Sequence, residues 1–261
     1  MRRLRLVAAT AAALLLPLLF IPTAAQAQEE TLDYVALGDS YASGSGAGSY
    51  LDLSCQRSQN AYPWLLSQEL GADLDFAACG GAKTGDVLAG QVGHLDADTD
   101  LVSISVGGND VGWVDVIIAC ILPFKNCTPD IEEAERKATQ ELPAKLDAVY
   151  AAIAQNAPNA EVYVLGYPRL FAAVNHCDAL GLISIAEQVR INQAADLLSS
   201  VIESAAAAHG FTYVDVRDEF SGHEICGSPP WLHGLTVSEI PYHPNASGHS
   251  QGYLPALLGA L

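Results

Sequence analysis

The sequence has little positive charge. Its 261 residues include 12 lysines and arginines against 30 aspartates and glutamates. Three of the basic residues, Arg2, Arg3 and Arg5, lie at the very start, and without them 9 basic residues face 30 acidic ones, a formal net charge of −21. A surface of this sign repels phosphate backbones and anionic lipid headgroups. We therefore expect no nucleic-acid partner.

Metal and phosphate motifs are also missing. The chain has no C-x-x-C pair, no H-E-x-x-H and no cluster of histidines, so a zinc site is not expected. The segment Gly80-Gly81-Ala82-Lys83-Thr84 lacks the glycine before lysine and the spacing of a phosphate-binding loop. We expect neither a metal ion nor an organic cofactor.

The first 27 residues are typical of a secretory signal peptide. The three arginines precede an apolar run, Leu6–Ile21, and the small-x-small sequence Ala25-Gln26-Ala27 follows it. A membrane anchor is the alternative, but the run contains Pro17 and is short for a membrane-spanning helix. We expect cleavage after Ala27, a secreted extracellular protein without a stable membrane anchor, and a single domain over residues 28–261.

Six cysteines follow the leader, and an even count in a secreted chain indicates three disulfides. Six cysteines allow 15 connectivities, which the sequence leaves open. Pairing the cysteines in sequential order closes the shortest loops. The most plausible bridge of this set joins Cys120 to Cys127, which lie closest in the chain. The six are Cys55, Cys79, Cys120, Cys127, Cys177 and Cys226.

Apolar strand-like runs alternate with helical patterns along the chain. The predicted strands are Tyr34–Leu37, Leu74–Ala77, Leu101–Val106, Val162–Leu165 and Phe211–Val216. The predicted helices are Tyr62–Leu70, Val111–Ile121, Ile131–Gln155, Ile183–Ala208 and a last one from Pro244 towards Leu258. This alternation predicts an α/β fold with a parallel sheet covered on both faces. Pro143 should break or kink the third helical pattern.

Three short motifs each follow a predicted strand. They contain Ser40, Gly81 and Asn109, and the late His243 stands just before the last predicted helix, which Pro244 can begin. Because ligands bind beyond the carboxyl ends of parallel strands, one fold would bring the three motifs to the same edge. Taken singly, Gly81 could instead be a plain turn glycine and Asn109 a helix cap.

Ser40 has the features of an exposed nucleophile. Gly38 permits a tight turn after the first strand, and Ser40 would then begin a helix with its own N–H free. An ordinary helix-capping serine is the alternative for this motif alone. The G-x-S-x-G elbow of α/β-hydrolases does not apply, because Ala42 occupies the final glycine position and Ser40 follows the first strand.

Together these blocks resemble those of the SGNH, or GDSL, hydrolases. The resemblance rests on Gly38-Asp39-Ser40, Gly81, Gly107-x-Asn109-Asp110 and His243, and it extends from Tyr34 to the C-terminus. It implies a three-layer α/β/α sandwich with a flavodoxin-like sheet of five parallel strands. It also implies Ser40 as nucleophile, His243 as general base, and an oxyanion hole formed by the N–H groups of Ser40 and Gly81 and the Asn109 amide.

The sequence departs from this family at the acid that orients the histidine. Many members carry Asp three residues before the histidine, where this chain has Ile240. We therefore expect a Ser40–His243 dyad in which the Ile240 backbone carbonyl accepts from the imidazole Nδ1–H. Glu239 is the alternative orienting acid. His249 is a second candidate base, but its place inside the last predicted helix favours the surface.

The resemblance implies a secreted esterase or lipase that works through an acyl-enzyme on an ester or lipid, and we expect a monomer. The apolar segment after Asn109 could line an acyl groove or belong to the core, and core is the more common use of such helix faces. Trp231 and Tyr242 could shape an alcohol or sugar site. A carbohydrate acetyl esterase and a noncatalytic binding domain of the same fold are the alternatives.

Overall fold

A computed structural model describes residues 31–178 and 181–261. The expected leader, residues 1–27, and its cleavage site lie outside this range. Residues Thr31–Leu261 form one compact unit. Within the described ranges, no helix combines the length and hydropathy that crossing a bilayer requires.

A sheet of five parallel strands lies at the centre of the molecule. Its strands run in the order β4-β1-β5-β6-β7, the flavodoxin-like order in which the first strand in sequence lies beside the second and the third. They are β1 Asp33–Gly38, β4 Asp73–Phe76, β5 Leu101–Ser105, β6 Glu161–Leu165 and β7 Thr212–Val214. All five predicted strands are confirmed, although β7 is shorter than expected. Residues of β1 and β5 are almost all buried, as a doubly covered sheet requires.

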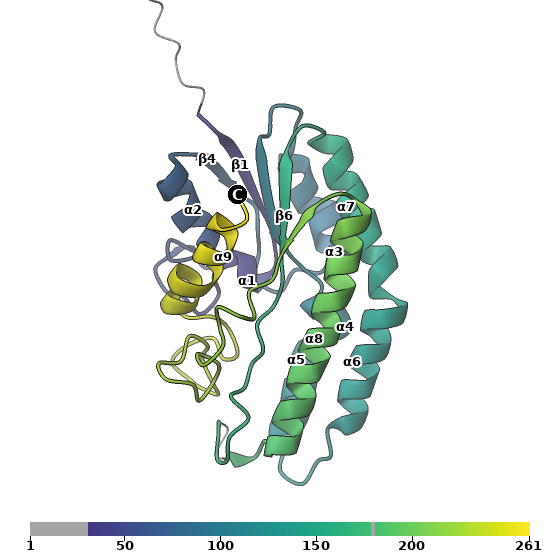
Figure 1. The fold of residues 1–261 in the computed structure, drawn as a ribbon, viewed down its shortest axis with the longest axis vertical. Helices are drawn as coiled ribbons and strands as arrows, with labels where there is room; N and C mark the ends of the chain where they lie inside the picture. The colour runs from purple at the N-terminus through teal and green to yellow at the C-terminus, as the bar shows by residue number, and fades with distance from the viewer. Residues whose placement is uncertain (1–30, 179–180) are drawn as a thin grey trace, which may run out of the picture. The chain divides into compact units, whose positions relative to one another are not determined.

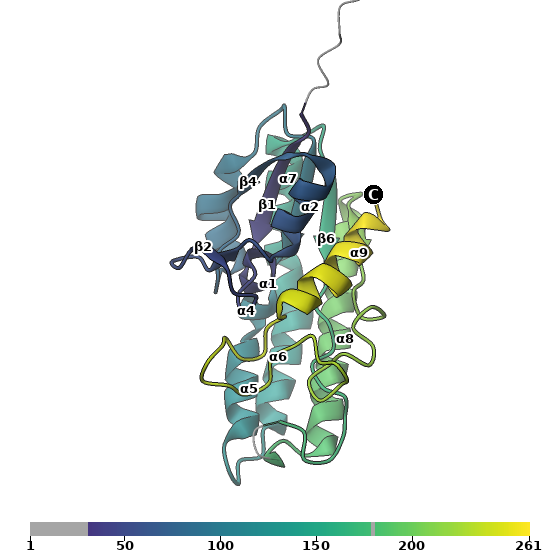
Figure 2. The same ribbon diagram turned by 90° about the vertical axis from the view of Figure 1, so that its left-hand side faces the viewer.

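Helices cover both faces of this sheet, which confirms the three-layer fold. Figures 1 and 2 show α2 (Tyr62–Leu70) and α9 (Leu254–Leu258) on one face and α7 (Leu142–Asn156) and α8 (Ile185–Ala208) on the other. The remaining helices are α1 Ser40–Ser43, α3 Thr84–Asp86, α4 Gly108–Val111, α5 Trp113–Ile121 and α6 Thr128–Gln140, with π-helical segments at Val87–Gln91 and Gly248–Tyr253 and a 3₁₀ turn at Val92–His94. The small hairpin of β2 (Tyr50–Asp52) and β3 (Arg57–Ser58) was not predicted.

Four predicted helices have different bounds in the structure, and for α8 the difference is only that it begins at Ile185 and not at Ile183. The long pattern containing Pro143 is two helices, because α6 ends at Gln140 and α7 begins at Leu142. The expected helix over 111–121 is divided at Gly112, whose φ of 82° ends α4. The last helical segment begins at Ala246 rather than at Pro244, and its π-helical part begins at Gly248. Pro244 and Asn245 belong to the loop that carries His243.

Three helices extend past the carboxyl edge of the sheet. In Figure 1 the lower parts of α5, α6 and α8 continue well below the ends of the strands. The loop after β7 returns to the same end of the molecule before α9 (Figure 2). These segments surround the edge at which the predicted catalytic motifs lie.

The three expected disulfides are confirmed, and they pair sequentially. They join Cys55 to Cys79, Cys120 to Cys127 and Cys177 to Cys226. The first fixes the loop before Gly81, where the Gly80 N–H also donates to the Cys55 carbonyl at 2.8 Å. The third closes a loop between the segment after β6 and the segment before His243. Cross-links of this kind stabilise a fold mainly by restricting the unfolded chain.

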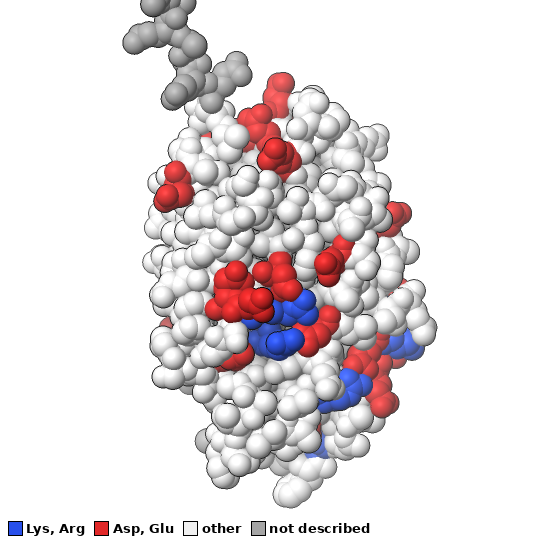
Figure 3. Space-filling model, in the orientation of Figure 1, with Lys and Arg blue, Asp and Glu red and all other residues white. Residues whose placement is uncertain are grey.

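Almost all of the few basic side chains lie beside a carboxylate. On the face shown in Figure 3, the blue side chains lie directly beside red ones. Arg217, for example, contacts both Asp215 and Asp196, and Asp196 also binds Arg169. Among the described lysines and arginines, every one except Lys83 lies within 4.0 Å of a carboxylate.

Substitution of Gly38 tests whether the turn that ends β1 requires glycine. Its φ is 127°, and a Cβ there would lie 2.3 Å from the Ser105 carbonyl oxygen and 2.9 Å from the Ser105 nitrogen. We expect Gly38→Ala to lower the free energy of unfolding by about 3 kcal/mol or more, since backbone strain and overpacking add. Urea denaturation measures the change in the free energy of unfolding.

The control is Gly71→Ala, because Gly71 has a φ of 64° but a Cβ added there would meet no atom within 4 Å. We expect it to cost about 1 kcal/mol, from backbone strain alone. Equal destabilisation by the two substitutions would contradict the proposed close approach of β1 to β5.

Candidate active site

Ser40 lies at the turn between β1 and α1. Asp39 caps this short helix, since its carboxylate accepts from the Tyr41 N–H at 2.9 Å, and the Asp39 N–H donates to the Ser105 carbonyl at 2.9 Å. Ser40 is therefore the first helical residue, and its side chain faces a cavity. This is the strand-to-helix turn that the sequence predicts.

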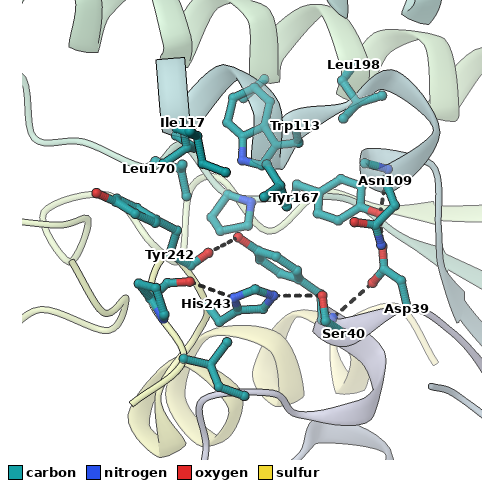
Figure 4. A pocket seen from close by; sticks show the side chains of 18 of the residues that line it. Asp39, Ser40, Asn109, Trp113, Ile117, Tyr167, Leu170, Leu198, Tyr242 and His243 are labelled. Carbon is teal, nitrogen blue, oxygen red and sulfur yellow. Dashed lines mark hydrogen bonds between the residues drawn. The ribbon is translucent and has the colours of Figure 1, made fainter. Parts of the chain in front are cut away.

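His243 reaches this serine from the other end of the chain. Its Nε2 lies 2.7 Å from Ser40 Oγ (Figure 4). On the other side of the ring, Nδ1 lies 2.8 Å from the backbone carbonyl of Pro241. These partners assign the tautomer: Nδ1 carries the proton and donates to the carbonyl, so that Nε2 can accept from the Ser40 hydroxyl.

The predicted orienting group was wrong by one residue. The carbonyl at Nδ1 belongs to Pro241 and not to Ile240. Tyr242 explains the difference, because its left-handed backbone (φ 60°) turns the chain so that the carbonyl two residues before the imidazole faces it. Glu239 is exposed, and no carboxylate of the described chain bonds to this imidazole.

The imidazole of His243 is kept neutral by its surroundings. Burial lowers its pKa below the ordinary value of 6.5, and nearby His233 lowers it further, while the bond to the Pro241 carbonyl opposes both. A neutral imidazole is the form that can accept a proton from a hydroxyl.

The predicted oxyanion donors lie at neighbouring turns. Asn109 lines the same cavity as Ser40 and His243, and its Nδ2 donates to the Ala82 carbonyl at 3.0 Å, which leaves its second N–H free. Gly81 does not line the cavity itself but directly precedes Ala82, with a φ of 79°. Within residues 31–178 and 181–261, the N–H groups of Ser40 and Gly81 donate to no other protein group.

Asp110 joins two of these turns. Its carboxylate accepts from the Thr84 N–H at 2.9 Å and from the Thr84 hydroxyl at 2.7 Å. Thr84 follows the Gly81 turn and Asp110 follows Asn109, so the bonds fix one turn against the other.

Tyr167 is a site residue that the sequence analysis missed. Its hydroxyl donates to the Asp39 carboxylate at 2.5 Å and accepts from the Gly108 N–H at 3.1 Å (Figure 4). Burial raises the pKa of Asp39 to about 7, although the bonds from Tyr167 and Tyr41 oppose the shift. Tyr167 follows strand β6, so the same carboxyl-edge rule that selected Ser40 and Asn109 could have found it.

The cavity at Ser40 is apolar and has a volume of about 370 Å³. Its walls come from α5, α8 and the segment after β6, and they include Trp113, Ile117, Leu170 and Leu198 (Figure 4). The segment expected as groove or core serves as both, since Ile117 is 4 % exposed and also faces the cavity.

Two further expectations about aromatic and histidine residues have different outcomes. Tyr242 lines the cavity, but Trp231 does not; it is buried and stacks on His223, with 3.7 Å between the ring centroids.

His249 was expected at the surface and is fully buried. Its Nδ1 accepts from the Tyr62 N–H at 3.3 Å, and burial lowers its pKa to about 3. His249 does not line the cavity at Ser40.

Residues 36–251 match the model of the GDSL-like lipase/acylhydrolase family. The chain belongs to this family. Membership confirms the resemblance found in the sequence motifs, and the protein is an ester hydrolase of the esterase and lipase type.

Named relatives of this GDSL hydrolase come from Streptomyces. It is 50% identical to Lipase 1 of Streptomyces coelicolor over 91% of this chain and 90% of that protein. Among solved structures, an extracellular lipase of Streptomyces rimosus is 48% identical with a TM-score of 0.84, covering 88% of this chain and all (100%) of that one. A phospholipase A1 of Streptomyces albidoflavus is 43% identical with a TM-score of 0.83 and the same coverage.

Proposed function

We propose that this GDSL hydrolase cleaves lipid esters outside the cell, with Ser40 as nucleophile and His243 as general base. The observation that carries the proposal is the 2.7 Å contact of Ser40 Oγ with an imidazole whose other nitrogen is bound to the Pro241 carbonyl. A hydroxyl is a weak nucleophile at neutral pH, and an adjacent oriented base activates it.

The reaction proceeds in two halves. Ser40 Oγ attacks the ester carbonyl carbon while its proton passes to His243 Nε2. The tetrahedral intermediate collapses when Nε2 returns this proton to the leaving alkoxide, and the acyl group stays on Ser40. His243 Nε2 then takes a proton from water as the water oxygen attacks the acyl carbonyl. The second tetrahedral intermediate collapses when Nε2 returns this proton to Ser40 Oγ, which breaks the bond to the acyl group and releases the acid.

Three donors would stabilise the oxyanion in both halves. They are the N–H groups of Ser40 and Gly81, which have no other protein partner in the described chain, and the second amide N–H of Asn109. Donors of this kind act on charge that exists only in the transition state and the intermediate, and each is worth about 3 kcal/mol in a comparable hydrolase.

The acyl chain of the substrate fits the cavity beside Ser40. Its side chains are almost all apolar, and Val114, Ile118 and Leu235 at its walls are 54%, 49% and 48% exposed. Apolar walls favour hydrocarbon over a polar sugar. The relatives named lipase and phospholipase A1 support the same substrate class.

Secretion and domain organisation belong to this proposal. Three disulfides are typical of proteins that fold in oxidising compartments, and one relative is described as extracellular. We place the signal peptide at residues 1–27 and the single hydrolase domain at residues 28–261.

Hydrolysis of p-nitrophenyl esters from acetyl to palmitoyl tests nucleophile and substrate together. We expect kcat/KM to rise from acetyl to medium or long chains, because each added methylene leaves water for the apolar cavity. Ser40→Ala should lower turnover about 10⁴-fold or more at every chain length. Ser67→Ala, which alters a buried serine on α2, should leave turnover unchanged.

Two outcomes would contradict this proposal. Activity that survives Ser40→Ala would remove the nucleophile. Ser40-dependent activity confined to the acetyl ester would favour a carbohydrate acetyl esterase instead.

The lowered pKa of His243 sets the acid limit of activity. Only the neutral imidazole accepts a proton, so activity falls as the pH drops through the folded-state pKa, which lies below 6.5. We expect kcat/KM for soluble p-nitrophenyl butyrate to reach half its maximum at a pH below 6.5, the ordinary pKa of histidine.

The control for this pH profile is His94→Gln, which removes an exposed histidine paired with Asp75 and should leave the profile unchanged. A half-maximum above the ordinary histidine pKa in the unaltered protein would mean that His243 is not the buried neutral base.

A further inference from the structure

The imidazole of His243 is oriented by a loop backbone instead of a side chain. The Pro241 carbonyl belongs to the loop backbone, so its direction towards Nδ1 is only as well fixed as the loop that carries it. Since a shift of about 1 Å can cost a large share of the rate, something must hold this loop in place.

Tyr242 makes that requirement stronger. It has a φ of 60°, a left-handed conformation that is unfavourable for a bulky side chain. Such strain persists only where surrounding contacts determine the backbone conformation. The same conformation aims the Pro241 carbonyl at Nδ1, so the contacts that maintain it also maintain the orientation of the base.

Three hydrogen bonds fix the peptide groups around His243. The Tyr242 N–H donates to the His233 carbonyl at 2.9 Å, and the His233 N–H donates to the His243 carbonyl at 2.9 Å. The third comes from a side chain: the Tyr41 hydroxyl donates to the Tyr242 carbonyl at 2.8 Å. This carbonyl belongs to the peptide bond that leads into His243.

Tyr41 is well placed to serve as a rigid support. It follows Ser40 directly in α1, and its side chain is 6% exposed. Its ring packs edge-on against Tyr167, with centroids 5.1 Å apart, and lies 5.2 Å from the His243 ring. One residue therefore joins the helix of the nucleophile to the loop of the base.

We propose that Tyr41 is a positioning residue for His243, and that its hydroxyl holds the loop whose Pro241 carbonyl orients the imidazole. This inference rests on the proposed roles of Ser40 and His243. Tyr41 takes no part in proton transfer. Tyr41 helps to orient the imidazole indirectly, through the loop, whereas the carboxylate of a three-residue triad orients it by a direct hydrogen bond.

Tyr41→Phe tests the inference, because it keeps the ring and removes only the hydroxyl. With soluble p-nitrophenyl butyrate, we expect kcat to fall about tenfold, because without this bond the loop holds the imidazole less closely in line with Ser40. KM should stay within about twofold, since Tyr41 itself lines the cavity and the substitution keeps its ring there. A merely structural role would instead lower stability and leave kcat per folded molecule unchanged.

Tyr150→Phe is the matched control. Tyr150 is fully buried in α7, and its hydroxyl bonds to no other described residue. The same chemical change there should leave kcat and KM as they are. A fall in kcat of equal size in both variants would overturn the assignment.

A second measurement does not depend on turnover. The Nδ1 proton of His243, bound to the Pro241 carbonyl, should give a downfield ¹H NMR signal that His243→Ala removes. We expect Tyr41→Phe to broaden this signal through faster exchange with water. An unchanged signal together with an unchanged kcat would overturn the inference.

These results separate the inference from the proposed function. If Ser40→Ala is inactive while Tyr41→Phe equals the unaltered protein, only the role of Tyr41 is wrong. If Ser40→Ala remains active, the proposed mechanism fails, and the role of Tyr41 fails with it.

Discussion

The parallel pairing of β1 with β5 is the constraint on which the active site depends. These strands lie in register from Tyr34 opposite Leu101 to Gly38 opposite Ser105, so they end together. The two turns that follow carry Ser40 and Asn109 and must therefore emerge side by side. The backbone pairing of the sheet thus brings the proposed nucleophile and the proposed oxyanion donor together.

The proposed base comes from a less regular part of the chain. His243 lies in a loop, and its orientation depends on the Pro241 carbonyl, a neutral dipole. A dipole stabilises an imidazolium ion less than a buried carboxylate does. Burial of the ring, which lowers the pKa of His243, adds to this difference because it also disfavours the charged form. In the proposed mechanism, close positioning of the base and oxyanion stabilisation therefore supply much of the rate.

The sheet and the common location of the motif blocks could be predicted from the sequence, because both follow from local patterns. Buried parallel strands need continuous apolar runs, and motifs after such strands must share an edge. The Pro241 carbonyl could not be predicted, because nothing in the residue type of Tyr242 demands a left-handed backbone; the surrounding hydrogen bonds impose it. Buried His249 was missed for a similar reason, since the packing of the last helical segment against Tyr62 decides its burial. Tertiary contacts determine both features.

Covalent trapping tests the central claim, the Ser40–His243 dyad, most directly. A p-nitrophenyl alkylphosphonate mimics the acyl-transfer transition state, and peptide mass spectrometry locates its adduct. We expect one phosphonyl group per chain, on the peptide that carries Ser40, with activity lost in proportion. In His243→Ala, labelling should slow by at least about 100-fold. A label on any other residue, or full activity in fully labelled protein, would contradict the account.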